Sequence, residues 1–313
     1  MKVVSAGAQS RQQMRRRLLR VTAILAGIVG LIAFYPLTGC ASLGGIPGAT
    51  TETTAKVAAT ATAMPKHHDS AWKLDWSDEF NGPKGASPDP SKWTPETGGE
   101  GWGSKQLDYD TNNQNAYQDG QGNLVLEARK GNPAGSKCWY GPCQYTSAHI
   151  STSGHFSFTY GRLEARIKIP YGQGIWSAFW LLGNNCATVG YPTCGEVDVM
   201  ENIGREPDLI YGTVHGPEYF SGNYRLQHGT FSDDFHVFAL QWDPSHLYFF
   251  MDGINYATLN KATLTNQRDW VYDHPFYIVL NLPVGGEWPG SPDSTTVFPQ
   301  KMYVSYIRLS TNE

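Results

Sequence analysis

The chain has 313 residues, a formal net charge of −4 and only 17% charged residues. These values exclude the broad positive field with which nucleic-acid-binding domains attract phosphate groups. Aromatic residues make up 13% of the chain, which also contains 34 glycines and 19 prolines. Because glycine and proline mark turns and aromatic residues favour strands, this composition predicts an all-β globular protein.

The first 40 residues have the pattern of an export signal. Five arginines between Arg11 and Arg20 precede the apolar run Val21–Phe34, which is too short to span a bilayer comfortably. The sequence Leu-Thr-Gly-Cys at 37–40 resembles the lipobox of bacterial lipoproteins, in which the cysteine carries the lipid. We therefore expect a signal over 1–40, lipidation of Cys40, and attachment to the cell envelope in the periplasm or at the cell surface. The alternative is ordinary cleavage near Ala41 and secretion.

Residues 41–70 predict a flexible linker, because they are rich in alanine, threonine, glycine and proline and show no hydrophobic period. The remaining residues, 71–313, contain no second linker and no internal repeat. They are expected to form one domain. Nothing in them indicates an oligomer interface, so we expect a monomer.

The cysteines fit an exported protein. With Cys40 assigned to lipid, four remain, in two close pairs within loops rich in glycine and proline. Four cysteines allow three pairings. Because an exported protein meets an oxidising compartment, and because proximity favours one pairing, we predict disulfides Cys138–Cys143 and Cys186–Cys194. Neither pair has the spacing of a zinc site with histidine partners.

Several segments of the domain have the pattern of β-strands. The most regular is Arg162–Ile169, in which apolar residues alternate strictly with charged ones, as in a half-buried strand. Met251–Ile254 predicts a tight turn, and no convincing amphipathic helix follows the signal. The other expected strands are Asn123–Lys130, Phe235–Trp242, Leu247–Met251, Phe276–Leu282 and Met302–Leu309. Short strands joined by turns suggest a β-sandwich.

The segment GEVDVMENIG, residues 195–204, places three carboxylates within six residues of strand-like sequence. Burying them would be costly without a function. In a regular strand, Glu196 and Asp198 share one face and Glu201 points to the other. One extra residue, a β-bulge around Val199–Met200, would return Glu201 to the face of Glu196. The sequence therefore predicts a bulge that lines up three acids.

Two carboxyl groups about 5–5.5 Å apart are the pair that a retaining glycosidase uses, one as nucleophile and one as acid. Repulsion between them helps to hold the acid's proton. The alternatives are an exposed acidic strand or a calcium site built from the same acids. The aromatic segment GIWSAFWLLG, at 174–183, favours a sugar site, because aromatic faces stack on the apolar faces of sugar rings.

The chain from about Trp72 to Leu309 resembles glycoside hydrolase family 16. Within that family it is most similar to the bacterial laminarinase-like endo-β-1,3-glucanases. GEVDVMENIG carries the family's E-x-D-x-x-E signature in its bulged form. The other similar segments, in the expected order, are WSDEFNG (76–82), FSFTYGRLEARIKIPYGQGIWSAFWLLG (156–183), YGTVHGP (211–217), DDFHVFALQWDP (233–244) and NLPVGGEWPG (281–290).

The resemblance implies a fold and a mechanism. The fold would be an all-β jelly-roll sandwich of two curved antiparallel sheets, like concanavalin A, with a substrate cleft across the concave face. The reaction would be double-displacement hydrolysis with retention. Glu196 takes the position of the nucleophile and Glu201 that of the general acid/base, while Asp198 takes that of the carboxylate that orients the nucleophile. No cofactor is implied for the chemistry.

The resemblance also implies a set of substrate-binding residues. Trp176 and Trp180 are similar to sugar-stacking residues near the cleavage point, and His215 is similar to a histidine near the acid/base. Hydroxyl-binding roles are expected for Arg166 and Asn115, and an outer subsite for Trp288. For each of these residues the alternative is ordinary packing or a solvated face.

One departure from the family concerns a structural calcium, which many members bind through an aspartate in the last strand. Ser305 stands at that position, and a hydroxyl is a poor calcium ligand beside a carboxylate. Glu79 would contribute if a calcium site persists, so a structural calcium is left open.

Three functions compete. The first is an endo-acting hydrolase of β-1,3 or mixed β-1,3/1,4 glucans such as laminarin. The second is a non-catalytic carbohydrate-binding protein, against which the three acids argue. The third is a transglycosylase, whose relatives usually carry the tighter E-x-D-x-E without the residue equivalent to Met200. Galactan-cleaving relatives share the bulged form, so a galactan is the alternative substrate.

Overall fold

The computed structural model describes residues 72–132 and 134–312. The expected signal over 1–40, with Cys40, and the expected linker over 41–70 lie outside these residues. Within the described part of the chain, every helix is too short or too polar to cross a membrane.

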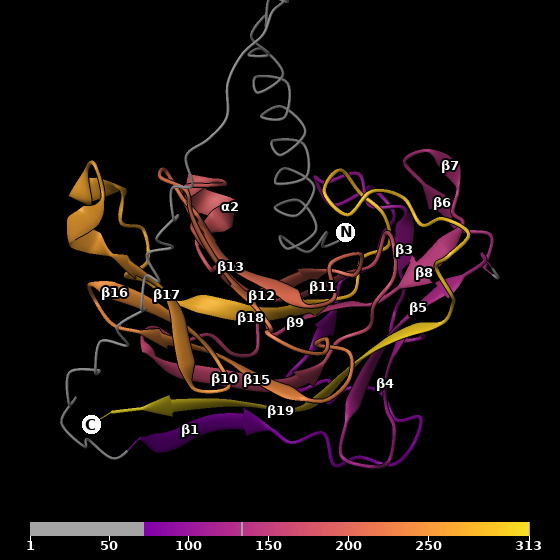
Figure 1. Ribbon diagram of the computed structural model, residues 1–313, viewed down its shortest axis with the longest axis horizontal. Coiled ribbons are helices and arrows are strands. Elements are labelled where there is room, and N and C mark those ends of the chain that lie inside the picture. The colour runs from indigo at the N-terminus through magenta and orange to yellow at the C-terminus, as the bar shows by residue number, and fades with distance from the viewer. Residues whose placement is uncertain (1–71, 133, 313) are drawn as a thin grey trace, which may run out of the picture.

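Two large sheets form the two layers of the molecule (Figure 1). Neighbouring strands run antiparallel, apart from β3 and β8, which are parallel. The larger sheet has the order β17-β16-β15-β10-β19-β5-β8-β3, with β1 on β19 and β4 on β5. Its strands are β1 (Lys73–Asp78), β3 (Asp108–Asp110), β4 (Ala116–Gln118), β5 (Leu124–Lys130), β8 (Tyr145–Ser147), β10 (Gly161–Lys168), β15 (His236–Trp242), β16 (His246–Met251), β17 (Ile254–Asn260) and β19 (Gln300–Thr311).

The smaller sheet has seven strands in the order β14-β13-β12-β11-β18-β9-β2. They are β2 (Thr94–Pro95), β9 (His149–Ser151), β11 (Trp176–Gly183), β12 (Glu196–Ile203), β13 (Leu209–His215), β14 (Phe220–Arg225) and β18 (Phe276–Asn281). The hairpin of β6 (Lys137–Cys138) and β7 (Gly141–Pro142) stands apart from both sheets. The short helical turns are α2 (Cys186–Val189), η1 (Lys261–Thr263) and η2 (Gln267–Asp269).

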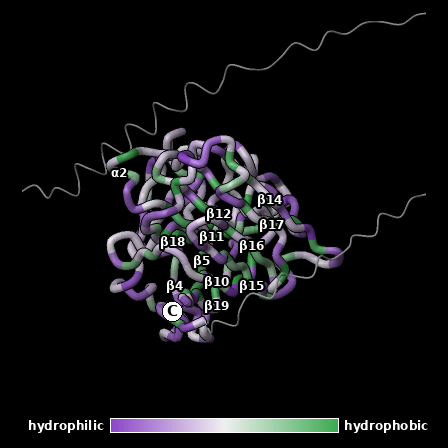
Figure 2. The backbone as a smooth tube through the Cα atoms, turned by 90° about the vertical axis from the view of Figure 1, so that its left-hand side faces the viewer, coloured by the Kyte–Doolittle hydropathy of each residue, from purple (hydrophilic) through white to green (hydrophobic). Residues whose placement is uncertain are grey.

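The core lies between the two sheets because each sheet is apolar on one face. In β10, Leu163, Ala165 and Ile167 are fully buried, while the charged residues between them are partly exposed. Phe179 and Leu181 of β11 are buried from the opposite sheet and belong to the same cluster. In Figure 2 the hydrophobic stretches run through the interior and the hydrophilic ones lie toward the periphery. The jelly-roll sandwich is therefore confirmed.

The expected strands are confirmed within about two residues at each end. The tight turn is also present, since Asp252 and Gly253 both have positive φ, 46° and 80°. Of the segment Trp76–Gly82, only the part up to Asp78 belongs to a strand. The sequence did not indicate the short edge strands or β13 and β14, because their hydrophobic alternation is weak.

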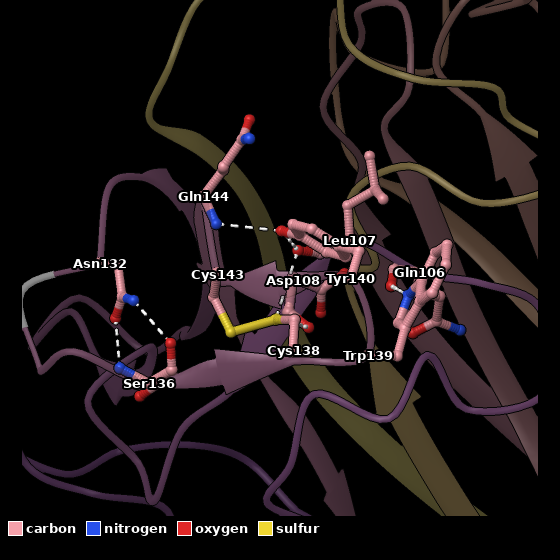
Figure 3. Close-up of a disulfide and its surroundings, with 10 residues drawn as sticks. All are labelled: Gln106, Leu107, Asp108, Asn132, Ser136, Cys138, Trp139, Tyr140, Cys143 and Gln144. Atoms are coloured by element: carbon pink, nitrogen blue, oxygen red, sulfur yellow. Dashed lines mark hydrogen bonds between the residues drawn. A yellow bond between two sulfur atoms is a disulfide. The ribbon is translucent and has the colours of Figure 1, made fainter.

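Both predicted disulfides are present. Cys186–Cys194 closes the loop that contains α2 and leads directly into β12. Cys138–Cys143 closes the β6–β7 hairpin, which Figure 3 shows against the segment before β3. There the Trp139 indole donates to the carbonyl of Gln106 at 2.8 Å and the Tyr140 hydroxyl to that of Leu107 at 2.6 Å. The hairpin thus fastens this segment to the end of the sandwich.

Candidate active site

Strand β12 contains the predicted bulge. Two of its residues, Val199 and Met200, lie opposite the single residue Gly212 of β13. The extra residue changes the parity of the strand, so that Glu201 returns to the face that carries Asp198. Both Val199 and Met200 are fully buried. The bulge therefore lines up the acids without placing a carboxylate in the core.

Packing from the larger sheet supports the bulge. The Tyr256 hydroxyl of β17 reaches across the core and donates to the carbonyl of Val199 at 3.5 Å. The same hydroxyl lies against Gly212, where an added Cβ would be only 2.6 Å from it and from the ring of Phe249. Position 212 therefore requires glycine because β13 passes so close to the rings behind the bulge.

The outward face of the seven-stranded sheet that carries Glu196, Asp198 and Glu201 is called the acid face here. Burial raises the pKa of all three carboxyl groups, to about 8 for Asp198. The neighbouring Asp198 raises the pKa of Glu196 further, so the pair of carboxyl groups retains a proton more readily than an isolated carboxyl group would. Burial and the nearby Asp198 charge raise the pKa of Glu201 well above its ordinary value. A neutral Glu201 beside a partly ionised pair is the arrangement that acid catalysis with a nucleophile requires.

His215 lies opposite Glu196 in the pairing of β12 with β13. Its Nε2 is 3.3 Å from Oδ2 of Asp198 and 3.8 Å from Oε1 of Glu196. A protonated imidazole here would favour the ionised form of the carboxyl pair. His215 is thus placed to influence both groups.

Aromatic side chains surround Glu201. The Trp176 indole donates to Oε1 of Glu201 at 3.2 Å. The Trp288 ring meets Trp176 edge-on at 5.4 Å between centroids and Tyr211 at 5.2 Å. These three rings form an apolar wall against which a sugar ring can stack.

A second aromatic group lies toward β18 and β9. The Trp180 indole donates to Oδ1 of Asn281 at 3.1 Å. Next to it on β9, the His149 ring lies 6.0 Å from Trp180 and 4.6 Å from Trp102. Burial lowers the pKa of His149 to about 4, so it is neutral near pH 7. This part of the acid face therefore offers neutral hydrogen-bonding groups between aromatic rings.

A family model described as "Glycosyl hydrolases family 16" matches residues 103–308. The chain belongs to glycosyl hydrolase family 16. Its nearly all-β sandwich and its bulged acid strand agree with that membership.

Relatives within the family support the same assignment. A "Beta-glucanase" of Rhodothermus marinus is 38% identical over 253 residues, covering 76% of this chain and 85% of that protein. The laminarinase catalytic domain of Thermotoga maritima superposes with a TM-score of 0.72 at 43% identity, covering 77% of this chain and 99% of that one. A non-specific endo-β-1,3(4)-glucanase, with a 1,3-β-D-cellobiosyl-glucose at its active site, has a TM-score of 0.70 at 34% identity, covering 78% and 96%.

In this family 16 chain, most of the expected substrate-binding residues lie near the acids. Trp176 hydrogen-bonds Glu201, Trp288 packs on Trp176, and His215 lies beside Asp198. Trp180 pairs with Asp198 across β11 and β12, so both project from the acid face.

Two of the substrate-binding expectations are corrected. Arg166 belongs to β10 of the other sheet, where its guanidinium stacks on the ring of Phe235 at 4.4 Å. The period of two placed it correctly on a polar face, but that face lies on the opposite side of the sandwich. Asn115 is buried, and its amide donates to the carbonyl of Glu127 at 2.6 Å. It holds the chain beside β5 and presents no free group to a ligand.

The sequence analysis missed three residues of the acid face: Asn281, His149 and Tyr211. Tyr211 lies four residues before His215 on β13, so the strand period would have placed the two on one face. Asn281 ends β18 and begins a segment already recognised as similar to the family. No sequence pattern predicted a role for His149, because its short strand β9 gives no indication that it pairs with β18.

The residues expected at the calcium site do not fit a calcium ion. Glu79 follows β1 and engages Arg308 through both oxygens, at 2.9 and 2.7 Å. Ser305 offers only a neutral hydroxyl. With the carboxylate neutralised by a guanidinium, the negative charge that calcium requires is missing.

Among the described residues, one group of three side chains is close enough to hold a metal ion, namely Glu196, Asp198 and His215. These are the residues of the candidate catalytic group. Hydrolysis by family 16 glucanases needs no cofactor.

Proposed function

We propose that this family 16 hydrolase is a retaining endo-β-1,3-glucanase that acts on β-1,3 or mixed β-1,3/1,4 glucans such as laminarin. The observation that carries the proposal is the bulge of β12, which places Glu196 and Glu201 on one face with Asp198 between them. The acids are flanked by aromatic rings that suit a sugar chain.

In the first step, a carboxylate oxygen of Glu196 attacks the anomeric carbon while Glu201 gives its proton to the departing glycosidic oxygen. Attack requires an ionised Glu196, so in the reacting state the proton of the acid pair rests on Asp198, whose carboxyl group orients Glu196. Trp176 holds the Glu201 carboxyl through its indole. The products are a covalent glycosyl ester of Glu196 and a shortened glucan.

In the second step, Glu201 removes a proton from a water molecule, and that water attacks the anomeric carbon from the side of the departed sugar. The ester bond breaks and its electron pair returns to Glu196. Two inversions at one carbon give net retention. His215 supports the ionised acids in both steps through its short distances to Asp198 and Glu196.

The relatives described above support the glucan substrate, since their names include β-glucanase, laminarinase and endo-β-1,3(4)-glucanase. The aromatic rings around Glu201 favour a ligand with apolar ring faces. Galactans also present such faces, so the preference for a glucan over a galactan rests on the names of the relatives.

Release of reducing ends from a panel of polysaccharides tests the proposal. The wild type, Glu196→Gln and the control Glu164→Gln are each assayed on laminarin, mixed-linkage β-glucan, agarose, carrageenan and xyloglucan. Glu164 is a carboxylate on the outward face of β10, in the other sheet. We expect activity on laminarin that Glu196→Gln abolishes and Glu164→Gln preserves. Activity only on a galactan would overturn the substrate, and binding without hydrolysis would favour the carbohydrate-binding protein.

Azide addition separates the roles of the two acids. An activated aryl glycoside of laminaribiose is used, because its leaving group needs little protonation. In Glu196→Gly, azide attacks in place of the missing carboxylate and yields the α-glycosyl azide. In Glu201→Ala, azide traps the glycosyl ester and yields the β-glycosyl azide. The reverse outcome would exchange the assigned roles.

We also propose that the enzyme is exported and attached to the cell envelope by lipid on Cys40, and that it works as a monomer. The lipobox-like sequence at 37–40 and the two disulfides support export. Radiolabelled fatty acid should enter the wild type in its host and fail to enter Cys40→Ser. Equal absence of label in both would contradict the anchor.

A further inference from the structure

The loop before β3 has an unusual backbone. This segment, residues 98–107, is called the Trp102 loop here and ends where β3 begins. Trp102 and Lys105 have φ angles of 47° and 57°, in the left-handed region that disfavours residues other than glycine. Such residues persist only where surrounding contacts hold them, and they gather at sites that hold a ligand. The Trp102 loop therefore needs a support, and its backbone indicates a role in a site.

The β6–β7 hairpin supplies that support through three hydrogen bonds. At the start of the loop, the backbone of Trp139 donates to the carbonyl of Gly99 at 2.8 Å. At the end of the loop, the Trp139 indole and the Tyr140 hydroxyl donate to the carbonyls of Gln106 and Leu107 (Figure 3). The hairpin thus holds both ends of the Trp102 loop.

The hairpin also packs closely against the loop. A Cβ added at Gly99 would lie 2.8 Å from Sγ of Cys138, and one added at Gly101 would lie 2.9 Å from Cδ1 of Trp139. The Cys138 sulfur belongs to the disulfide with Cys143. The bond that closes the hairpin is therefore also part of the surface on which the loop rests.

Trp102 connects the loop to the acid face. Its ring lies 4.6 Å from the ring of His149, which is buried and lies 6.0 Å from the ring of Trp180. Trp180 in turn lies opposite Asp198 in the pairing of β11 with β12. A shift of the loop would therefore move the Trp102 ring and open the edge of the acid face beside His149.

The same loop also contacts the segment after β18. The backbone of Glu287 donates to the carbonyl of Ser104 at 2.9 Å, and the backbone of Leu107 donates to the carbonyl of Val284 at 2.7 Å. These bonds fasten the segment that leads to Trp288, whose ring belongs to the aromatic wall described above. The Trp102 loop thus lies between the hairpin and both aromatic groups of the acid face.

We propose that the disulfide-closed β6–β7 hairpin positions the Trp102 loop, and through it the aromatic rings that receive the glucan chain. This inference rests on the proposed glucanase function and adds a requirement to it, namely an intact hairpin outside both sheets. Trp139 and Tyr140 are positioning residues, because they bond the loop and lie away from the acids. A loop held in its binding conformation loses little entropy when the substrate arrives, so the hairpin acts on substrate affinity and leaves the chemical step unchanged.

Titration calorimetry with laminarihexaose in the inactive Glu196→Gln background measures this effect on affinity. Trp139→Ala keeps the disulfide but removes the indole that bonds and supports the loop. Cys138→Ser combined with Cys143→Ser opens the hairpin. We expect each variant to bind about tenfold more weakly, because the loop must then be ordered during binding. Binding equal to that of the parent in both variants would overturn the inference.

A double-mutant cycle shows whether the hairpin acts through Trp102. Trp102→Ala should itself weaken binding, and adding Trp139→Ala to it should then cost less than about twofold. Fully additive losses would overturn the inference. Asn132→Ala is the matched control and should bind as its parent does, because the Asn132 side chain bonds the backbone of Ser136, across the disulfide from Gln106 in Figure 3. An equal loss in this control would also overturn the inference.

Hydrolysis of laminarin by the active enzyme separates positioning from a general structural role. In Trp139→Ala, KM should rise about tenfold, while kcat and the pH profile should stay those of the wild type because Glu201 is untouched. A fall in kcat at unchanged KM would overturn the inference. Tyr140→Phe removes only a hydroxyl and should raise KM about twofold, so it serves as the test if the larger substitutions unfold the protein, and an unchanged KM would then count against the hairpin. A wild type that neither binds nor hydrolyses glucans would overturn the proposed function and this inference with it.

Discussion

The indole nitrogen of Trp176 donates a hydrogen bond to Oε1 of Glu201 at 3.2 Å. The two residues are 25 positions apart and lie on neighbouring strands of one sheet. Burial raises the pKa of Glu201, and this hydrogen bond acts against that rise because it stabilises the carboxylate. The proposed acid Glu201 is thus tuned by an aromatic residue whose ring packs against Trp288 beside it.

Trp176→Phe removes this hydrogen bond while keeping an aromatic ring. The pKa of Glu201 should rise further, so the acid stays protonated to higher pH. The alkaline limb of the kcat/KM profile on laminarin should therefore move to higher pH, and kcat/KM at the optimum should fall about tenfold. Trp139→Phe is the control, since that indole bonds the carbonyl of Gln106 in a separate hairpin. An alkaline limb that stays in place or moves to lower pH would contradict the tuning.

Gly212→Ala tests the packing behind the bulge. The new Cβ would lie 2.6 Å from the Tyr256 hydroxyl and from the Phe249 ring. We expect a loss of about 1–3 kcal/mol in the free energy of unfolding, the usual cost of overpacking, and a strong loss of kcat as Glu201 is displaced. Urea unfolding and laminarin hydrolysis measure the two effects.

Tyr256→Phe provides the partner for a double-mutant cycle. Alone it removes the hydrogen bond to Val199 and should cost about 1 kcal/mol. Combined with Gly212→Ala, it also removes one of the two groups that obstruct the new Cβ. The loss of unfolding free energy in the double variant should therefore be smaller than the sum of the two single losses, by at least about 0.5 kcal/mol. Strict additivity would show that the hydroxyl does not crowd position 212.

Asp108 makes stability depend on pH. Burial raises its folded-state pKa to about 6 from an ordinary value of 3.8. Between these two pH values the folded state binds more protons than the unfolded state. The contribution of Asp108 to the free energy of unfolding therefore falls as pH rises, and it is constant above about pH 6. One pH unit corresponds to about 1.4 kcal/mol, which gives about 3 kcal/mol over this window.

Asp108→Asn tests this contribution together with that of the neighbouring Asp110, whose pKa the Asp108 charge raises. The amide oxygen of the variant can still accept the 2.8 Å hydrogen bond from the backbone of Val284. The unfolding free energy of the variant relative to the wild type should increase from pH 4 to pH 6. Asp89→Asn is the control, since its partner Ser91 lowers the Asp89 pKa and the relative stability should not increase. A difference between Asp108→Asn and the wild type that does not vary with pH would contradict the prediction.

Removal of calcium should leave the wild type unchanged. Glu79 is engaged by Arg308, and Ser305 supplies no charge. Differential scanning calorimetry should give the same Tm in EDTA and in millimolar calcium. The Tm of Ser305→Asp should rise with added calcium, because the new carboxylate supplies the negative charge and the ligand oxygen that the serine hydroxyl lacks. A wild-type Tm that falls in EDTA would show that calcium binds despite the ion pair.

The sequence was sufficient to predict the bulge in β12 and the two disulfides. Parity alone required an extra residue between Asp198 and Glu201, since without it a carboxylate would face the core. Proximity alone selected the two cysteine pairs. These inferences succeeded because they depend on residues within about ten positions of one another.

The errors arose where distant strands meet. Arg166 alternates with buried residues as Trp180 does, and the strand period cannot say to which sheet a polar face belongs. Asn115 was expected to bind hydroxyls, but its neighbours across β5 already use its amide. His149 lies on the acid face only because β9 pairs with β18.

By itself, the sequence determined the strands with strong alternation, the polar and apolar faces of those strands, and the carboxylates that share β12, because these follow from local alternation and the cost of burying charge. Only the tertiary structure decided which outward face is the acid face and which aromatic rings surround it. That choice depends on the pairing of strands far apart in the chain, and on the two sheets burying their apolar faces against each other.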